Sequence, residues 1–147
     1  MTEYNGIKFT VMGTPVAKGR PKFARRGNFV STYTPKKTVS YENLVQLSFM
    51  QSAGTDFKPF DCPLMVRVMA YFPRPKGHFG SGKNEGVLKK SAPVMMTTKP
   101  DVDNVAKACI DALNGIAFTD DKLIVHLQAA KCYSALPCCE IEICEVE

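Results

Sequence analysis

The sequence predicts one mixed α/β domain with two layers, in which a small mixed β-sheet of about four strands is packed by two main helices. Three observations predict this class. The 147 residues are enough for one ordinary hydrophobic core, so we expect residues 1–147 to form a single domain. Hydrophobic residues make up 45% and charged residues 22% of the chain, as in globular proteins. Strand-like and helix-like apolar patterns both occur along the chain.

Three segments have side chains that alternate between two faces, which is the pattern of a strand with one buried face. The alternation predicts strands over residues 6–12, 64–72 and 138–145, and residues 123–132 also predict a strand. In the second of these, alternate side chains on one face are all apolar: Leu64, Val66, Val68, Ala70 and Phe72. This segment is the strongest of the predicted strands.

Two segments have the apolar spacing of a helix that is buried on one side. The first begins after Pro35 and covers about residues 36–53. Its apolar stripe comprises Tyr41, Leu44, Val45 and Phe49. The second covers residues 102–114, between Pro100 and Gly115, which are typical start and stop signals. Its apolar stripe comprises Val102, Val105, Ala106, Cys109, Ala112 and Leu113.

Two long connections lie between these elements. Residues 17–37 are basic and loop-like because Gly19, Pro21 and Gly27 interrupt any helix, although residues 29–34 favour a short strand. Residues 76–100 are rich in glycine and lysine and predict a mobile basic surface loop. A loop of that length in so small a domain is usually functional or disordered.

Charge is distributed unevenly along the chain. The net charge is +5, but residues 1–100 carry 16 Lys and Arg against 5 Asp and Glu, whereas residues 101–147 carry 3 against 9. The basic part is suited to a polyanion and the acidic part to cations. The alternative is that the two parts mix in space and their charges only solvate the surface.

Basic side chains concentrate between the first strand and the first helix, with one more at the start of the long loop. The candidates for DNA binding are Lys18, Arg20, Lys22, Arg25, Arg26, Lys36, Lys37 and Lys76. Such residues neutralise phosphates, release counterions and give salt-sensitive binding. Phe23 and Phe29 lie among them and either stack on unpaired bases or anchor the loop in the core. The alternative for the basic cluster is an ordinary solvated loop.

Five of the seven aspartates fall between positions 101 and 121. Asp101 and Asp103 lie at the predicted start of the second helix, where one carboxylate serves as an N-cap but two exceed what a cap requires. A hard cation such as Mg²⁺ takes oxygen ligands, usually one or two carboxylates together with water and substrate phosphate. The acidic pair is therefore either a helix cap or part of a metal site.

The same helix repeats charged residues on the face opposite its apolar stripe. Asp103, Lys107 and Asp111 recur every four residues. Lys107 either stabilises negative charge on a scissile phosphate or forms an ordinary pair with an acid one turn away. Asp121, at the head of the next predicted strand, completes the site if residues 116–121 run back along the helix, as their extended length just permits.

The stretch KPDVDNVAKACIDALNGIAFTDDKLI resembles the RusA family of Holliday-junction resolvases, small endonucleases common in phages and prophages. The family pattern is Asp-x-Asp-Asn at a helix start, Lys four residues after the second Asp, then Asp-Ala-Leu, then Asp-Asp before a strand. Residues 13–21 and the stretch from Tyr33 to Glu42 also look like the family. The resemblance covers about residues 6–130.

The resemblance implies a Mg²⁺-dependent endodeoxyribonuclease, for which Mn²⁺ can substitute, that resolves four-way branched DNA by paired symmetric nicks. It also implies a homodimer without a small-molecule cofactor. It assigns metal binding and catalysis to three acids, Asp101, Asp103 and Asp121. Lys107 would be catalytic or contact phosphate, Asp120 and Asn104 are weaker candidates, and Asp111 would serve the structure.

Several function classes lack support. No run of about 18 apolar residues spans a membrane, and the polar N-terminus opens no signal peptide. Six cysteines without an export signal indicate the cytoplasm, and without a C-x-x-C pair they predict small core residues rather than zinc ligands. Two alternatives to a junction resolvase stay open: a non-catalytic protein that binds branched DNA, and a nuclease with a broader preference for flaps or forks.

Overall fold

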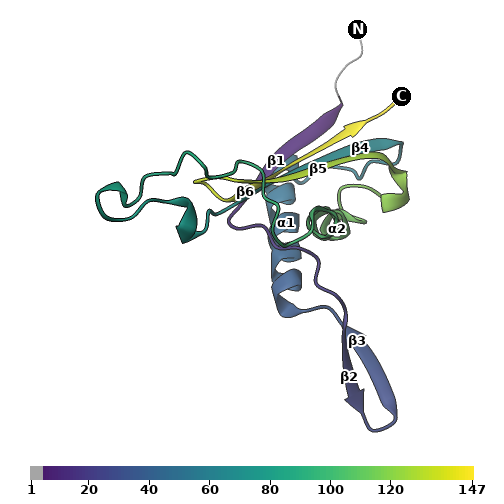
Figure 1. Ribbon diagram of the computed structural model, residues 1–147. Coiled ribbons are helices and arrows are strands. Elements are labelled where there is room, and N and C mark those ends of the chain that lie inside the picture. Colours follow the sequence, from purple (N-terminus) through teal and green to yellow (C-terminus); the bar gives the residue numbers. More distant parts are fainter. Residues whose placement is uncertain (1–4) are drawn as a thin grey trace.

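A computed structural model describes residues 5–147 as a β-sheet with two helices on one face (Figure 1). The elements are β1 (Gly6–Met12), β2 (Lys22–Arg26), β3 (Phe29–Tyr33), α1 (Lys36–Ala53), β4 (Leu64–Phe72), α2 (Val102–Leu113), β5 (Ile124–Tyr133) and β6 (Cys138–Glu145). Short 3₁₀ turns lie at Lys76–His78, Gly82–Asn84 and Asp121–Leu123. The mixed α/β class and the two-layer arrangement predicted from the sequence are confirmed.

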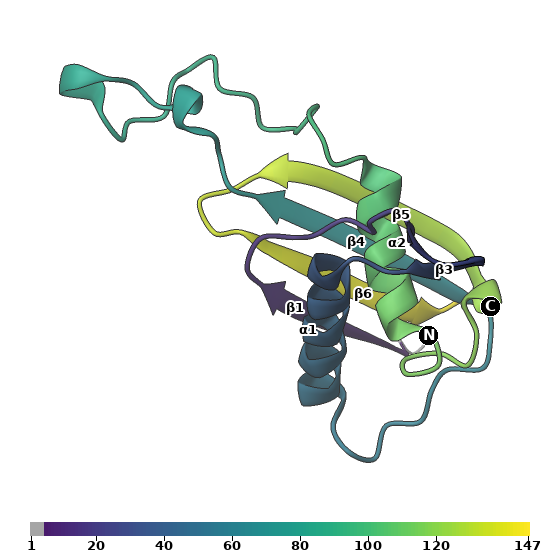
Figure 2. The same ribbon diagram turned by 90° about the horizontal axis from the view of Figure 1, so that it is seen from below.

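The main sheet has the strand order β1-β6-β4-β5. β6 runs antiparallel to β1 and to β4, whereas β4 and β5 are parallel. A parallel pair needs a long crossover connection, and here the crossover contains α2, which packs on the same face of the sheet as α1 (Figure 2). The topology thus places α2 directly against the two strands that it connects.

The core lies between this sheet and the helices. All five apolar residues predicted for one face of β4 are at most 5% exposed, and so are Tyr41, Val45 and Phe49 of α1. Two residues that were predicted to lie in the buried helical stripes, Leu44 and Val102, are exposed instead. Leu44 is 40% exposed because it lies about 100° around the helix axis from Val45, at the edge of the stripe. Val102 is 38% exposed because it is the first residue of α2.

Residues 22–33 form more structure than the sequence predicts. β2 and β3 pair as an antiparallel hairpin from Lys22 opposite Tyr33 to Arg26 opposite Phe29, closed by Gly27 at φ 60°. Its side chains are exposed on both faces apart from Ala24, so no alternation marks the first strand. Phe23 and Phe29 are 74% and 81% exposed, and the prediction that they anchor the loop in the core is wrong.

Residues 73–100, which we call the arm, leave the end of β4 and return to the start of α2 (Figure 2). The arm adds no strand to the main sheet, but Met95 forms an isolated antiparallel bridge with Cys132 of the edge strand β5. The arm contains two of the 3₁₀ turns and otherwise follows an irregular path, as predicted for residues 76–100. Neither α1 nor α2 has the length and apolar character needed to cross a membrane.

Candidate active site on helix α2

The start of α2 carries two carboxylates that make no capping hydrogen bond or ion pair within residues 5–147. Asp101 occupies the N-cap position with an extended backbone, but its side chain accepts no capping hydrogen bond. Asp103 follows within the first turn, and the ion pairs among residues 5–147 include neither acid. Helix capping therefore does not account for these two side chains, which both lie exposed at the surface.

The packing of α2 decides which side chains face outward. Five residues of its predicted stripe are at most 1% exposed: Val105, Ala106, Cys109, Ala112 and Leu113. Burial of these side chains fixes the rotation of the helix and leaves Asp103, Lys107 and Asp111 on its outer side, as their four-residue spacing predicts. The side chain of Lys107 is 60% exposed and that of Asp111 is 24% exposed.

The chain after α2 turns back and brings Asp121 toward the helix. Gly115, at φ 80°, allows the turn, and the buried residues Ala117 and Phe118 secure it against residue Phe60. The backbone N–H of Asp121 donates to Asn114 Oδ1 at 3.0 Å, which ties the 3₁₀ turn before β5 to the end of α2. The predicted position of Asp121, just ahead of the next strand, is thus found in the structure.

One open cavity of about 340 Å³ collects most of the predicted site residues. Its polar lining comes from Asp103, Lys107, Asp111 and Asp121, and its apolar lining from α2 and β5. The structure therefore places Asp103 and Lys107 of α2 in the same cavity as Asp121 of the 3₁₀ turn before β5. Asp101, at the N-cap of α2, lies outside this cavity.

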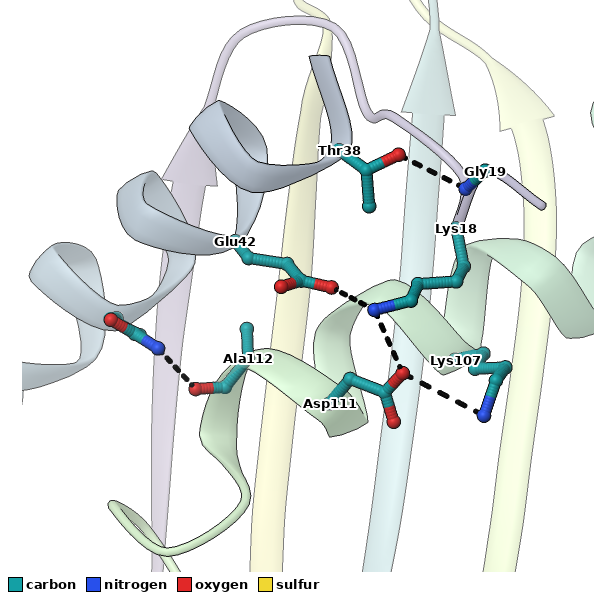
Figure 3. Close-up of polar contacts among 8 residues, drawn as sticks. Lys18, Gly19, Thr38, Glu42, Lys107, Asp111 and Ala112 are labelled. Atoms are coloured by element: carbon teal, nitrogen blue, oxygen red, sulfur yellow. Dashed lines mark hydrogen bonds and ion pairs between the residues drawn. The ribbon is translucent and has the colours of Figure 1, made fainter. Parts of the chain in front are cut away.

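The far end of the cavity is organised by an ion-pair network (Figure 3). Lys18 Nζ lies 2.7 Å from Glu42 Oε1 of α1 and 3.1 Å from Asp111 Oδ2 of α2. Lys107 Nζ lies 3.6 Å from the same oxygen of Asp111. Burial by itself lowers the pKa of Lys18, but its hydrogen bonds and charge pairing with Glu42 and Asp111 outweigh this effect and raise the pKa above 10.5. Lys18 is therefore a fixed cation between the two helices.

Asp120 differs from its neighbour Asp121. Its Oδ1 accepts a hydrogen bond from the backbone N–H of Lys122 at 2.9 Å, so it caps the 3₁₀ turn. This hydrogen bond lowers the pKa of the Asp120 carboxyl. Asp120 thus has a structural partner. Asn104 is the other weaker candidate, and its backbone oxygen accepts a hydrogen bond from the N–H of Lys18 at 2.8 Å.

The chemistry of the donor set fits a hydrated divalent cation. Asp103 and Asp121 contribute carboxylate oxygens to one cavity, and Mg²⁺ is commonly held by one or two carboxylates with water and phosphate as its remaining ligands. Within residues 5–147, however, no three acidic, histidine or cysteine side chains are close enough together to hold a metal. The predicted trio of Asp101, Asp103 and Asp121 is therefore not assembled as a preformed cage.

The predicted DNA-binding residues fall into two groups. Arg20, Lys22, Arg25, Arg26, Lys36, Lys37 and Lys76 are exposed along the hairpin, the start of α1 and the arm. Lys18 is different, because its ammonium already has two carboxylate partners and its side chain is only 19% exposed. The structure does not support Lys18 as a phosphate contact.

Sequence reasoning missed the partners of Lys18. Glu42 lies in α1, far from Asp111 in the sequence, and no local pattern connects the two. The backbone N–H of Gly19 donates to the buried hydroxyl of Thr38 at 3.0 Å, and a Cβ at Gly19 would lie 2.9 Å from Pro35 Cγ. The run of glycine and basic residues at 18–21 was the only signal that this segment approaches another element closely.

Two comparisons relate the chain to known proteins. The family model "Endodeoxyribonuclease RusA" matches residues 12–144. An uncharacterized protein of Bacillus subtilis (strain 168), YqaN, is 38% identical over 140 residues, which are 95% of this chain and 96% of that protein. The chain therefore belongs to the RusA endodeoxyribonuclease family, and this membership makes it a nuclease that hydrolyses DNA and supports action on Holliday junctions.

Proposed function

We propose that this protein is a Mg²⁺-dependent, structure-specific endodeoxyribonuclease that resolves Holliday junctions by paired symmetric nicks during DNA recombination and repair. The observation that carries the proposal is the single cavity that Asp103, Lys107 and Asp121 line together, in a chain of the RusA family. Because its six cysteines are free thiols, we infer that the protein works in the reducing cytoplasm.

Asp103 and Asp121 would hold the cation, with Asp101 joining from the rim of the helix when DNA is bound. Mn²⁺ would substitute for Mg²⁺, since the ligands are oxygens. When bound, the cation lowers the pKa of an attacking water and polarises the scissile phosphate. Lys107, whose side chain is exposed, would place its ammonium against the negative charge that develops on that phosphate.

Lys18 has a positioning role in this proposal. It neutralises Asp111, which otherwise would draw the ammonium of Lys107 into a close pair. The distance of 3.6 Å between Lys107 and Asp111 is longer than the 3.1 Å between Lys18 and Asp111. Lys18 is thus the nearer cation to Asp111, and the exposed ammonium of Lys107 would stay available to the cavity that Lys107 lines.

The hairpin would hold the branch point of the DNA. Lys22, Arg25 and Arg26 supply phosphate contacts, and the exposed rings of Phe23 and Phe29 supply surfaces on which unpaired bases stack. The hairpin stands clear of the body in Figure 1, so its two faces are accessible to DNA at once. Its base is joined to the site, because the N–H of Lys18 binds the first turn of α2.

A junction with two equivalent strands to cut calls for two active sites, and the outer face of α1 supports a homodimer. Between residues 38 and 53 only Glu42 is charged, and Lys18 binds its carboxylate. Four large apolar side chains on this face are 40% to 53% exposed: Val39, Leu44, Leu47 and Met50. An uncharged face can pair with its own copy, whereas the rest of a chain with net charge +5 repels another copy.

Sedimentation velocity tests the dimer. We expect the wild-type protein to sediment as a dimer and Leu47→Glu as a monomer, since the substitution would bury one new carboxylate from each copy in an otherwise uncharged interface. Leu136→Glu is the matched control, because Leu136 is 61% exposed in the turn between β5 and β6. A monomeric wild type, or a Leu47→Glu variant that still dimerises, would contradict this interface.

Cleavage of synthetic DNA tests the activity. The purified protein is incubated with an immobile four-way junction, a fork, a flap and a linear duplex, each with Mg²⁺, with Mn²⁺ or with EDTA. We expect paired symmetric nicks in the four-way junction only, in either metal, and none in EDTA. Equal cutting of forks or flaps would favour the broader nuclease.

Non-catalytic binding is the remaining alternative. Tight binding of the four-way junction without nicks on any substrate, and with the same affinity in EDTA, would sink the nuclease proposal. Cleavage of the junction in EDTA would instead contradict the assignment of a metal to Asp103 and Asp121.

A further inference from the structure

We propose that the arm, residues 73–100, is a second DNA-binding element. It would bind one duplex of the branched substrate, on the other side of α2 from the hairpin. This inference rests on the proposed function, and it names a contact that the hairpin and the α2 cavity do not provide. It is carried by three features of the arm: its charge, the way its base is fixed, and where it joins the site.

The arm carries a concentrated positive charge. It contains Arg74 and five lysines, and Glu85 is its only acidic residue. Every residue from 81 to 91 is exposed, including Lys83, Lys89 and Lys90. No ion pair among residues 5–147 involves these lysines. Their charges are thus not used inside the protein and are suited to the phosphates of a nucleic acid.

The base of the arm is fixed to the edge of the sheet. Arg74 Nη1 donates to the carbonyl of Pro93 at 2.7 Å, and its guanidinium lies 5.5 Å from the centre of the Tyr133 ring. His78 packs edge-on against the same ring, with centroids 4.7 Å apart. The N–H of Tyr133 in turn donates to Val94 O at 2.9 Å. The outgoing and returning segments of the arm are therefore held together where they leave the sheet.

The outer part of the arm also has a defined path. The N–H of Gly80 donates to Val87 O and that of Lys89 to His78 O, each at 2.9 Å, so the arm folds back on itself. Between these bonds lies the turn at Gly82–Asn84. Gly80 is in close contact with this turn, since a Cβ there would lie 2.6 Å from that of Asn84. The lysines are consequently presented from a folded loop rather than from a free chain.

The arm and the hairpin join the same turn of α2. The arm ends at Pro100, whose carbonyl accepts a hydrogen bond from Lys131 Nζ at 2.7 Å, and Asp101 follows directly. On the other side, the N–H of Lys18 donates to Asn104 O at 2.8 Å. A groove of about 500 Å³ lies between these attachments, and Lys37 and Lys99 are the charged residues that line it.

The two projections leave the body in different directions (Figures 1 and 2). A linear duplex placed along the hairpin would not follow the arm, whereas a branched DNA offers helices in more than one direction. The arm would therefore favour branched over linear substrates, because only a branched DNA contacts both projections at once. It would bind through the phosphate backbone, which lysine recognises without sequence preference.

A second copy of the chain is the competing occupant, since Val87, Leu88, Val94 and Met95 of the arm are 45% to 65% exposed. The charge argues against it, because a lysine-rich loop approaching a chain of net charge +5 is repelled. DNA is therefore the partner that the arm fits.

The test measures binding alone, in an Asp103→Asn background that is expected not to cut. The arm variant combines Lys83→Gln, Lys89→Gln and Lys90→Gln. The matched control combines three exposed cations away from the helices, Lys8→Gln, Lys58→Gln and Arg67→Gln. Affinity for a four-way junction and for a short linear duplex is titrated over a range of salt, and melting curves confirm that each variant is folded.

We expect the arm variant to bind the junction about tenfold or more weakly, with the slope of log K against log salt reduced by about two to three. Its affinity for the duplex, and the affinity of the control for either DNA, should change much less. An unchanged salt slope, an equal loss with the control, or an equal loss on the duplex would overturn the proposal. A shift from dimer to monomer in sedimentation, with junction binding unchanged, would assign the arm to the second copy instead.

The outcome is independent of the proposed nuclease activity. A wild-type protein that binds the junction but never nicks it would refute that activity and leave the arm proposal standing. A protein that cuts junctions normally but whose arm variant binds them as tightly as its parent would do the reverse.

Discussion

The acidic residues at the two ends of α2 differ in their interactions with the rest of the protein. At the start of α2, Asp101 and Asp103 have neither a capping hydrogen bond nor an ion pair in the part of the chain that the structure describes. Near the last turn, Asp111 is held by Lys18 and Lys107 and is 24% exposed. Among the described residues, one end of α2 thus has a carboxylate held by two lysines, and the other end has carboxylates that form no ion pair.

This difference indicates which carboxylates of α2 stabilise the fold and which are available for catalysis. A carboxylate with protein partners contributes to the folded state, and its loss leaves other charges unpaired. A carboxylate without such partners contributes little to folding and is free to bind a cation or a phosphate-bound water. The partnered end of α2 therefore holds the helices in place, and the unpartnered end offers the ligands.

The strongest test of this contrast replaces one aspartate at each end. We expect Asp103→Asn to reduce junction cleavage by at least about 10³-fold, because a cation ligand is lost, and to leave the melting temperature within about 2 °C. Junction binding should persist or tighten, since repulsion between the carboxylate and phosphate is relieved. Gel-based cleavage, binding titration and thermal melting measure the three quantities.

Asp111→Asn is the matched control, with the same change of charge on the same helix. It should lower the melting temperature by several degrees, because Lys18 loses a partner, and should reduce cleavage far less than Asp103→Asn. If the two variants exchange these effects, the assignment of the two ends is reversed.

Lys107 sharpens the contrast, because it lies between the two ends. Its side chain is 60% exposed and its pair with Asp111 is long, so Lys107→Gln should change the free energy of unfolding by only about 0.5 kcal/mol or less. Cleavage should fall by about 10²-fold as charge stabilisation is lost, with Lys107→Arg retaining part of the rate. Normal cleavage by Lys107→Gln would remove Lys107 from the site.

Lys18 gives the smallest expected effect on cleavage and a clear effect on stability. Lys18→Met leaves Glu42 and Asp111 without their shared cation and should lower the free energy of unfolding by about 1–3 kcal/mol at neutral pH. Because the folded state raises the pKa of Lys18 above 10.5, this stabilisation is complete below pH 10.5 and is lost as the pH rises through the higher folded value. Denaturant unfolding at several pH values should show the gap between wild type and variant narrowing at strongly alkaline pH.

The Lys18 experiment has its own control in Lys8→Met, since Lys8 is an exposed residue of β1 that forms no ion pair within residues 5–147. Its unfolding free energy should match the wild type at every pH. A Lys18→Met protein as stable as wild type would mean that the network contributes nothing to the packing of α1 against α2.

The sequence by itself determined the elements whose signals are local. The alternation of residues 64–72 predicted β4 to its ends, since one face of that strand is buried under the helices. The proline and glycine that flank α2, with its apolar stripe, placed the Asp101 and Asp103 pair at a helix start. The sequence did not predict β2, because a hairpin exposed on both faces shows no alternation of apolar and polar residues.

Only the tertiary structure decided which charged residues have partners. Lys18 belongs to a basic run that predicts DNA contact, yet the packing of α1 against α2 places its ammonium between Glu42 and Asp111. The return of Asp121 to the cavity likewise depends on the burial of Ala117 and Phe118. Composition and spacing show that a charge is present, but whether it is neutralised depends on side chains that the fold brings together from distant parts of the chain.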